Sequence, residues 1–207
     1  SLGKVNETIK CLADCGYLDS HYSLTNKATY LLNECKPRNA IILAAGIGMR
    51  MAPINYQIPK GLLKVYGIPL VERLIEQLHA VEIFNIDIVV GFMKEKFEYL
   101  IDKFGVNLIY NPVYATKNNI HSLNLVANKI SNSYIIPCDI WAETNPFSTS
   151  ELYSWYSVSD EIDNESTVRV NRKRQLVKVL PGQAGNTMTG ICYLLENEAA
   201  IVRQKIQ

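Results

Sequence analysis

Two glycines and two cations lie close together in the stretch LAAGIGMRMAPINYQIPKG. Gly46 and Gly48 follow an apolar run, Arg50 comes two residues later, and Lys60 lies ten residues beyond Arg50. Glycine can adopt positive φ, and successive N–H groups in such a turn form an anion-binding nest. Arg adds a planar charged fork and Lys a compact charge. The stretch therefore predicts a polyphosphate-binding loop.

Other glycine-rich phosphate loops fit less well. The third glycine of the Rossmann pattern G-x-G-x-x-G is missing, and no G-K-[ST] of a Walker A loop occurs. A glycine turn flanked by solvated cations is the alternative that needs no ligand.

Further polar or small residues follow other apolar runs. Asp139 ends the run SYIIPCD, where a hard carboxylate suits Mg²⁺ held jointly with triphosphate oxygens. Asn118, Asn119 and Ser122 can hydrogen-bond a base or ribose edge, although Asn119 can instead simply cap a helix. Gly91 follows the run IDIVV, where it would let a base approach the strand end or merely terminate the strand.

A regular alternation of strands and helices must position these residues. Continuous apolar runs at 39–43, 86–91, 106–111 and 133–139 predict strands buried on both faces. Helical patterns separate them at 69–81, 94–105 and 118–130, and the third strand follows Gly105 directly. We therefore expect a Rossmann-like three-layer α/β/α fold with a mostly parallel mixed sheet, in which ligands bind at the carboxyl ends of strands.

Some helix faces and the last elements are also predicted. A hairpin is expected over 166–182, a strand over 186–195 and a helix over 196–206. The inward residues of the second and third helices are expected to be Phe97, Leu100, Ile101 and Phe104, and Ile120, Leu123, Ala127 and Ile130.

The bulk composition is that of an ordinary globular protein. The 207 residues are 48% hydrophobic and 20% charged, with a formal net charge of +1. Five cysteines without a C-x-x-C pair indicate neither a disulfide framework nor a zinc site, and fit a reducing cytoplasm. No apolar run is long enough for a membrane span, and no signal peptide is evident. Because the chain begins with Ser and stops inside a helical pattern, we expect a fragment of a longer chain.

The segment AIILAAGIGMRMAPINYQIPKGLLKVYGIPLVERLIEQL resembles the nucleotidyltransferases that join a nucleoside triphosphate to a phosphorylated small molecule. Their pattern, L-x-x-G-x-G-x-R followed by P-K, is kept, although Met49 stands where Ser or Thr is usual. The likeness covers residues 39–195. It implies catalytic roles for Lys60 and Arg50, and nucleotide contacts from Leu43, Ala44, Ala45, Gly46, Gly48, Met49, Arg50, Gly91, Asn119 and Ser122.

Within that family, NPVYATKNNIHSLNLVANKISNSYIIPCD is similar to the bacterial CTP:phosphocholine cytidylyltransferases, which show N-x-x-Y, N-N-x-x-S-L and a strand ending in Asp. The Gly-Thr-Ala loop of the sugar branch is missing. The resemblance implies that CTP and phosphocholine give CDP-choline and pyrophosphate, for decoration of the cell surface. A sugar-1-phosphate nucleotidyltransferase is the alternative enzyme.

The resemblance also implies roles at the reacting groups. Lys60 would contact the α-phosphate or the acceptor phosphate, Arg50 the β- and γ-phosphates, and Asp139 would hold Mg²⁺. Pro137 and Ile140 depart from the family's pattern around that Asp. A second metal-binding Asp normally follows a late strand, but none occurs after Asp163. We expect it to have been lost with a missing C-terminus, unless the protein has departed from the family.

Choline recognition would need aromatic faces around a quaternary ammonium. Four aromatic residues are expected near the Asp139 edge, or alternatively in the core, and they are Trp141, Tyr153, Trp155 and Tyr156.

Residues 1–38 form a separate segment, which precedes the transferase domain at 39–207. They resemble the second half of a winged helix-turn-helix, with a recognition helix, a wing and a last helix capped by Thr25. The segment contains five cations and four carboxylates, and this nearly neutral charge is unfavourable for binding DNA phosphates. DNA binding, docking and dimerisation are the alternatives for this segment, and a nucleotide-sensing DNA-binding regulator without catalysis is the rival for the whole chain.

Overall fold

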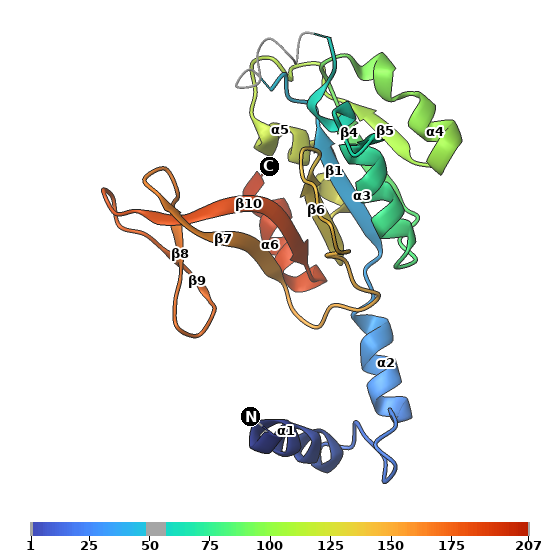
Figure 1. The fold of residues 1–207 in the computed structure, drawn as a ribbon, viewed down its shortest axis with the longest axis vertical. Helices are drawn as coiled ribbons and strands as arrows, with labels where there is room; N and C mark the ends of the chain where they lie inside the picture. Colours follow the sequence, from blue (N-terminus) through green and yellow to red (C-terminus); the bar gives the residue numbers. More distant parts are fainter. Residues whose placement is uncertain (1, 49–56, 207) are drawn as a thin grey trace.

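A six-stranded sheet forms the centre of the computed structural model, which describes residues 2–48 and 57–206 (Figure 1). The strand order is β5-β4-β1-β6-β10-β7. Four strands are parallel, whereas β10 runs antiparallel to both of its neighbours. This confirms the predicted α/β class with a mostly parallel sheet. The strands are β1 (Asn39–Ala44), β4 (Ile86–Val90), β5 (Asn107–Tyr110), β6 (Ser133–Pro137), β7 (Trp155–Asp163) and β10 (Gly185–Leu194).

Helices cover both faces of this sheet. Ile41 and Ile42 in β1 point to opposite faces, and both are fully buried, as the continuous apolar run predicts. One face packs against α3 and α4, and the other against α5 and α6 (Figure 1). The four helices are α3 (Leu70–His79), α4 (Tyr99–Phe104), α5 (Asn119–Asn124) and α6 (Glu196–Ile206).

The apolar stripe of α3 holds that helix on the sheet. Pro69 stands just before the first helical residue, where its fixed φ suits a helix start. Leu70, Leu74 and Leu78 are buried, as their spacing predicts. Burial of each such side chain contributes about 1.5–3 kcal/mol, so this stripe fixes α3 against the sheet.

The helix predicted over 94–105 is divided in two. A 3₁₀ turn at Lys94–Phe97 precedes α4, and Gly105 ends the helix with a φ of +70°. Phe97 and Leu100 are buried, but Ile101 is 45% exposed, so the expected inward position of Ile101 is wrong. A 3₁₀ turn has three residues per turn, which shifts the inward face relative to a continuous α-helix.

The helix predicted over 118–130 is also shorter than expected. It ends at Asn124 and is followed by a 3₁₀ turn at Ala127–Lys129. Ala127 and Ile130 are buried, whereas Ile120 is 57% exposed, so its predicted inward position is wrong. Ile120 lies in the first turn of α5, at the rim of a cavity described below.

The second half of the chain adds hairpins and the antiparallel strands. The predicted hairpin consists of β8 (Val168–Val170) and β9 (Leu176–Lys178), and the predicted late strand and last helix are β10 and α6. Strand β7 and the small hairpin of β2 (Lys64–Val65) and β3 (Ile68–Pro69) were not predicted.

Residues 2–35 stand away from the sheet (Figure 1). They form α1 (Leu2–Asp14) and α2 (Asn26–Glu34), with Gly16 at a φ of +75° after α1. Thr25 caps α2, as predicted. No residue of α1 is buried. The winged-helix assignment and the boundary between residues 38 and 39 stay predictions. None of the helices within residues 2–48 and 57–206 has the length and apolar character needed to cross a membrane.

Candidate active site

A cavity of about 480 Å³ opens at the carboxyl ends of the central strands. β1 and β6 are neighbours in the sheet, so the loops that follow them meet at one edge. This is the edge at which ligands bind in parallel α/β sheets. The lining residues are Leu43, Gly46, Ile47, Gly48, Lys60, Tyr114, Ala115, Asn118, Asn119, Pro137, Cys138 and Asp139.

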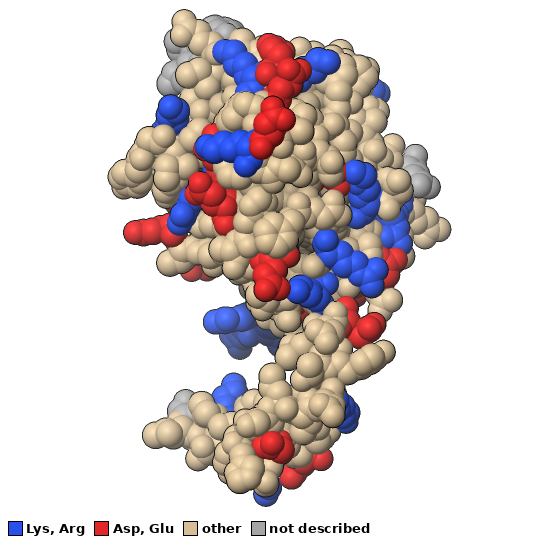
Figure 2. All heavy atoms as spheres, turned by 90° about the vertical axis from the view of Figure 1, so that its right-hand side faces the viewer, with Lys and Arg blue, Asp and Glu red and all other residues tan. Residues whose placement is uncertain are grey.

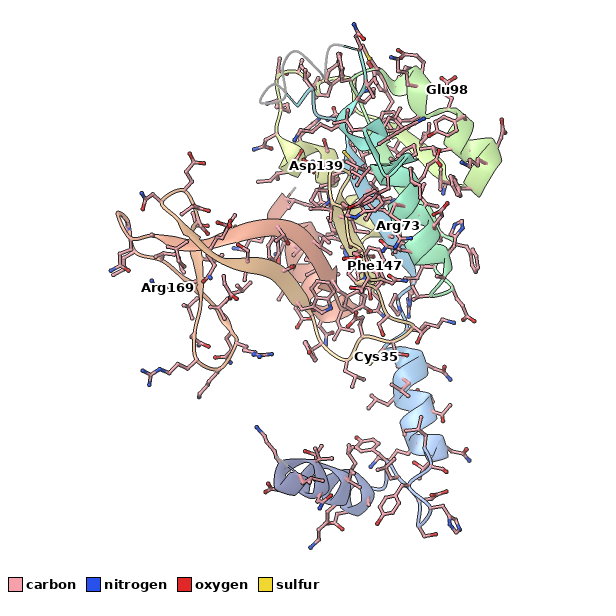
Figure 3. All side chains as sticks on the ribbon, in the orientation of Figure 1. Cys35, Arg73, Glu98, Asp139, Phe147 and Arg169 are labelled. Carbon is pink, nitrogen blue, oxygen red and sulfur yellow. The ribbon has the colours of Figure 1, made fainter. Side chains whose placement is uncertain are left out.

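Lys60 and Asp139 face each other in this cavity. The Nζ of Lys60 lies 2.7 Å from Oδ2 of Asp139, and their side chains are 22% and 37% exposed. Lys60 begins the 3₁₀ turn at Lys60–Leu62, while Asp139 follows β6, and Figure 3 shows Asp139 beside the end of that strand. The two predicted reacting groups, which are 79 residues apart in sequence, are thus brought together as an ion pair.

Two glycines let the Lys60 turn approach the sheet. Gly48 has a φ of +71°, and a Cβ there would lie 2.9 Å from both Cγ and Cε of Lys60. A Cβ on Gly61 would lie 3.1 Å from the Cβ of Cys138. Gly46 has open space on its Cβ side, toward the cavity. Ordinary side chains at Gly48 and Gly61 would therefore move Lys60 away from Asp139.

The predicted nucleotide contacts Met49 and Arg50 lie outside the described residues. Their assignment stays a prediction. In the described part of the loop, Gly46 and Gly48 nevertheless line the cavity, together with Leu43 near the end of β1.

Asn118, rather than Asn119, caps α5. The Oδ1 of Asn118 accepts hydrogen bonds from the backbone N–H groups of Ile120 and His121. The alternative that Asn119 is merely the cap is therefore wrong. Asn119 is the first residue of α5 and lines the cavity, where its amide can meet a ligand.

Ser122 does not line the cavity. It is 3% exposed, and its Oγ accepts a hydrogen bond of 3.0 Å from Nδ2 of Asn111. Asn111 also accepts a hydrogen bond from the N–H of Val113 through its Oδ1. The geometry gives Ser122 a positioning role, because this pair fixes the loop that delivers Tyr114 and Asn119 to the site.

Gly91, Ala44 and Ala45 lie beneath the site rather than in it. A Cβ on Gly91 would lie 2.6 Å from both the carbonyl oxygen of Ala45 and the Cβ of Tyr114. The missing side chain of Gly91 thus makes room for the protein's own residues. Ala44 and Ala45 are 4% and 3% exposed, and they pack on opposite faces of the sheet.

Several lining residues were not singled out from the sequence. Tyr114 belongs to the N-x-x-Y pattern, which was the available signal, and its ring contacts Phe92. Cys138 lies between Pro137 and Asp139. Burial, helped by the neighbouring Asp139 carboxylate, raises the pKa of the Cys138 thiol to about 12, so this thiol is not a nucleophile near neutral pH.

A second, apolar cavity of about 520 Å³ adjoins the first. The two share Leu43 and Asn119. Among the described residues that line the apolar cavity, none is charged. The full lining is Leu43, Asn119, Ile120, Leu123, Ile135, Ser154, Trp155, Tyr156, Leu176, Gly190, Cys192, Leu194 and Val202.

The four aromatic residues considered for choline are divided by the structure. Trp155 and Tyr156 border the apolar cavity from β7 and not from the Asp139 edge. Only Tyr156 packs on the cavity face of the sheet, because the ring of Trp155 contacts Tyr134 on the opposite face. Trp141 instead contacts the ring of Tyr66, and Tyr153 is 69% exposed. The expectation that all four gather near Asp139 is therefore wrong, because the loop after Asp139 carries Trp141 away from the cavity and β7 returns on the other side of β10.

The chain was compared with known proteins. The MobA-like NTP transferase domain model matches residues 40–154. A choline-phosphate cytidylyltransferase of Haemophilus influenzae is 34% identical over 79% of this chain and 72% of its own length. One of Streptococcus pneumoniae is 44% identical over 56% of this chain, and here the chain spans only about half (51%) of that relative's length. A 2-aminoethylphosphonate cytidylyltransferase of Lancefieldella rimae is 39% identical over 52% of this chain and 44% of its own length.

Solved structures give the same picture of the fold. CTP:phosphocholine cytidylyltransferase from Streptococcus pneumoniae superposes with a TM-score of 0.75 at 34% identity, covering 82% of this chain and 76% of that chain. The inositol-1-phosphate CTP transferase from T. maritima has a TM-score of 0.60 at 22% identity, over 79% of this chain and 73% of its own, which shows a shared fold alone.

Proposed function

The chain belongs to the MobA-like NTP transferase family, and we propose that it joins CTP to phosphocholine, giving CDP-choline and pyrophosphate. The observation that carries the proposal is the Lys60–Asp139 pair in a cavity bounded by the Gly46–Gly48 turn. A cation and a carboxylate beside a glycine turn at one strand edge are what a metal–triphosphate requires. The cytidylyltransferases among the relatives support the choice of CTP.

In the proposed reaction, a phosphate oxygen of the acceptor attacks the α-phosphorus of CTP. One P–O bond forms, the bond to the bridging oxygen of the β-phosphate breaks, and pyrophosphate leaves with the electron pair. No enzyme nucleophile is needed, so positioning and charge neutralisation supply the catalysis. Lys60 neutralises the α-phosphate or the acceptor phosphate, and the Gly46–Gly48 backbone orients the triphosphate. Arg50 is assigned to the β- and γ-phosphates.

Mg²⁺ fits the donor set at this edge. Asp139 is a partly exposed carboxylate, and no cluster of three or more His, Cys, Asp or Glu occurs in the part of the chain that the structure describes. Mg²⁺ is commonly held by one or two carboxylates together with substrate phosphates. Asp139 would therefore share the ion with the triphosphate, and the ion would supply positive charge against the phosphate oxygens. Lys60 would then be available to contact phosphate rather than Asp139.

The apolar cavity supports phosphocholine as the acceptor. Its uncharged lining and the ring of Tyr156 suit a trimethylammonium group, which offers no N–H donor. A primary ammonium has three donors to satisfy, and a sugar carries several hydroxyls. The cavity offers few polar side chains for either, so 2-aminoethylphosphonate and sugar 1-phosphates are the less favoured acceptors.

The proposal extends to the cellular setting. The reaction is assigned to the bacterial cytoplasm, in keeping with five cysteines that are all free thiols. DNA binding by residues 1–38 stays a separate prediction, because their charge is nearly balanced and the α1–α2 segment does not touch the cavity.

A pyrophosphate-release assay on the full chain with Mg²⁺ tests the proposal. CTP, UTP, GTP and dTTP are each paired with phosphocholine, phosphoethanolamine, 2-aminoethylphosphonate and sugar 1-phosphates. We expect release with CTP and phosphocholine. Release only with another acceptor would reassign the acceptor while keeping the chemistry. Binding of CTP without release from any pair would contradict the enzyme and favour a nucleotide sensor.

A further inference from the structure

A cation-rich hairpin projects from the far end of the sheet (Figure 1). Residues 166–180, which contain β8 and β9, include five cations and no carboxylate. The chain as a whole carries +1, so the hairpin holds +5 and all other residues together carry −4. Four carboxylates lie just before the hairpin, at Asp160, Glu161, Asp163 and Glu165, so the positive field is local to the β8–β9 segment. The five cations are Arg169, Arg172, Lys173, Arg174 and Lys178.

None of these five side chains has a carboxylate or hydrogen-bonding partner within the described residues. All five residues are exposed, and Figure 3 shows Arg169 on the hairpin, away from the α/β body. The preceding residues include Asp163, but its carboxylate accepts hydrogen bonds from Thr187 and from the N–H groups of Glu165 and Ser166. Figure 2 shows a different face of the molecule, where cations and carboxylates are intermingled. The hairpin charge is therefore not explained by ion pairs within the fold.

The turn of the hairpin is held in one conformation. Oδ1 of Asn171 accepts hydrogen bonds from the N–H groups of Lys173 and Gln175, and its carbonyl accepts one from Arg174. Arg174 has a φ of +59°, a conformation that favours Gly or Asn at this place. The turn thus holds the three consecutive cations Arg172, Lys173 and Arg174 at the tip of the hairpin.

The base of the hairpin is anchored to the sheet. The N–H of Val170 donates to Oδ1 of Asn186 in β10, at 2.8 Å. The N–H of Val179 donates to the carbonyl of Thr167, and Val179 is buried. The hairpin is thus anchored to the sheet at its base. Arg169 pairs with Val177 and Lys178 with Val168, so Arg169 and Lys178 lie on opposite faces of the hairpin. The cations that can meet one surface together are therefore those of the tip.

Exposed apolar side chains accompany the cations. Val177 is 41% exposed and Leu180 is 67% exposed, and no Phe, Tyr or Trp occurs between residues 164 and 184. Single-stranded nucleic acid is typically bound by aromatic stacking, which this segment lacks. Basic residues combined with aliphatic ones are typical of surfaces that bind anionic membranes. We infer that the β8–β9 hairpin docks the protein on the headgroups of an anionic phospholipid bilayer.

Co-sedimentation of the full chain with vesicles tests this inference. Vesicles of phosphatidylcholine alone are compared with vesicles that also contain phosphatidylglycerol. The triple variant Arg172→Glu/Lys173→Glu/Arg174→Glu reverses the charge of the hairpin tip. The matched control, Lys4→Glu/Lys10→Glu/Lys205→Glu, changes the net charge equally at exposed cations elsewhere. Thermal unfolding of each variant shows that the fold is kept.

We expect binding only to the anionic vesicles, weakened by added salt because the charges are exposed. The tip variant should lose about a hundredfold or more in partition coefficient, while the control stays near wild type. Equal binding by the two variants, or no binding by the wild type, would overturn the inference. So would competition by a DNA duplex that binds more tightly than the vesicles and depends on the same tip, because the hairpin would then be a nucleic-acid contact.

Discussion

The side chain of Lys60 crosses directly over Gly48, because a Cβ built on that glycine would lie 2.9 Å from two carbons of the lysine stem. Gly48 also has a φ of +71°. Both features require glycine at position 48. They bring together the glycine turn and Lys60, which lie twelve residues apart in the motif. The position of the reacting ammonium is thus set partly by an absent side chain.

Gly48→Ala should impair both folding and activity. The left-handed conformation costs a non-glycine residue about 1–2 kcal/mol, and the new methyl group must displace Lys60. We expect kcat/KM to fall about tenfold or more, measured by pyrophosphate release. Gly67→Ala is the matched control, since Gly67 has a φ of +83° with open space around it. Equal activity losses in the two variants would contradict the contact with Lys60.

Asp139→Asn should remove Mg²⁺-dependent activity while leaving the fold intact. The ion pair with Lys60 is partly exposed, so its loss should change the free energy of unfolding by no more than about 1 kcal/mol. The rate at saturating CTP is measured across a Mg²⁺ titration. Glu143→Gln, an exposed residue four positions further on, is the control. An unchanged Mg²⁺ dependence in the Asp139 variant would contradict the assignment of Asp139 as a Mg²⁺ ligand.

Ile120→Glu should change the choice of acceptor. Ile120 is 57% exposed at the rim of the apolar cavity, in the first turn of α5, where a carboxylate is tolerated. A carboxylate there would pair with a primary ammonium. We expect kcat/KM to rise for phosphoethanolamine relative to phosphocholine, by about tenfold. The neutral variant Ile120→Gln should not show this change, and a shift of the same size in both would mean that the cavity does not hold the acceptor head.

Much of this arrangement follows from the sequence, for identifiable reasons. The apolar run around Ile41 and Ile42 is buried on both faces, and the leucine stripe of α3 is buried on one face, as their patterns predict. The pattern of apolar residues alone therefore locates these two elements. The pairing of Lys60 with Asp139 follows from the rule that ligands bind at strand ends, once Lys60 is assigned to the connection after β1 and Asp139 to the end of β6.

Other features depend on contacts between distant segments. Ile101 and Ile120 fit a helical stripe, but 3₁₀ turns next to them change which side chains face the core. Ser122 looks like a ligand contact until Asn111 is seen to take up its hydroxyl. Tyr156 reaches the apolar cavity only because β7 pairs with β10, a long-range pairing that no local pattern specifies.

Lys129→Met should destabilise the fold strongly. Lys129 is the partner of Asp87, whose side chain is only 1% exposed within β4. Removing the cation leaves a buried carboxylate unpaired, which costs about 3–5 kcal/mol. Urea unfolding measures the change. Lys36→Met, which breaks the exposed pair with Glu82, should leave the free energy of unfolding nearly unchanged. Adding Asp87→Asn to the Lys129 variant should restore part of the loss, and no restoration would contradict the charge argument.

The formation of CDP-choline by a Lys60→Ala variant tests the central claim most directly. The product is measured from CTP and phosphocholine with Mg²⁺, beside wild type and Lys64→Ala, whose lysine is exposed on β2 outside the cavity. If Lys60 neutralises the reacting phosphates, its loss should lower kcat/KM roughly 10²–10³-fold, while Lys64→Ala stays near wild type. Equal rates for the two variants would contradict the assignment of this cavity as the site of nucleotidyl transfer.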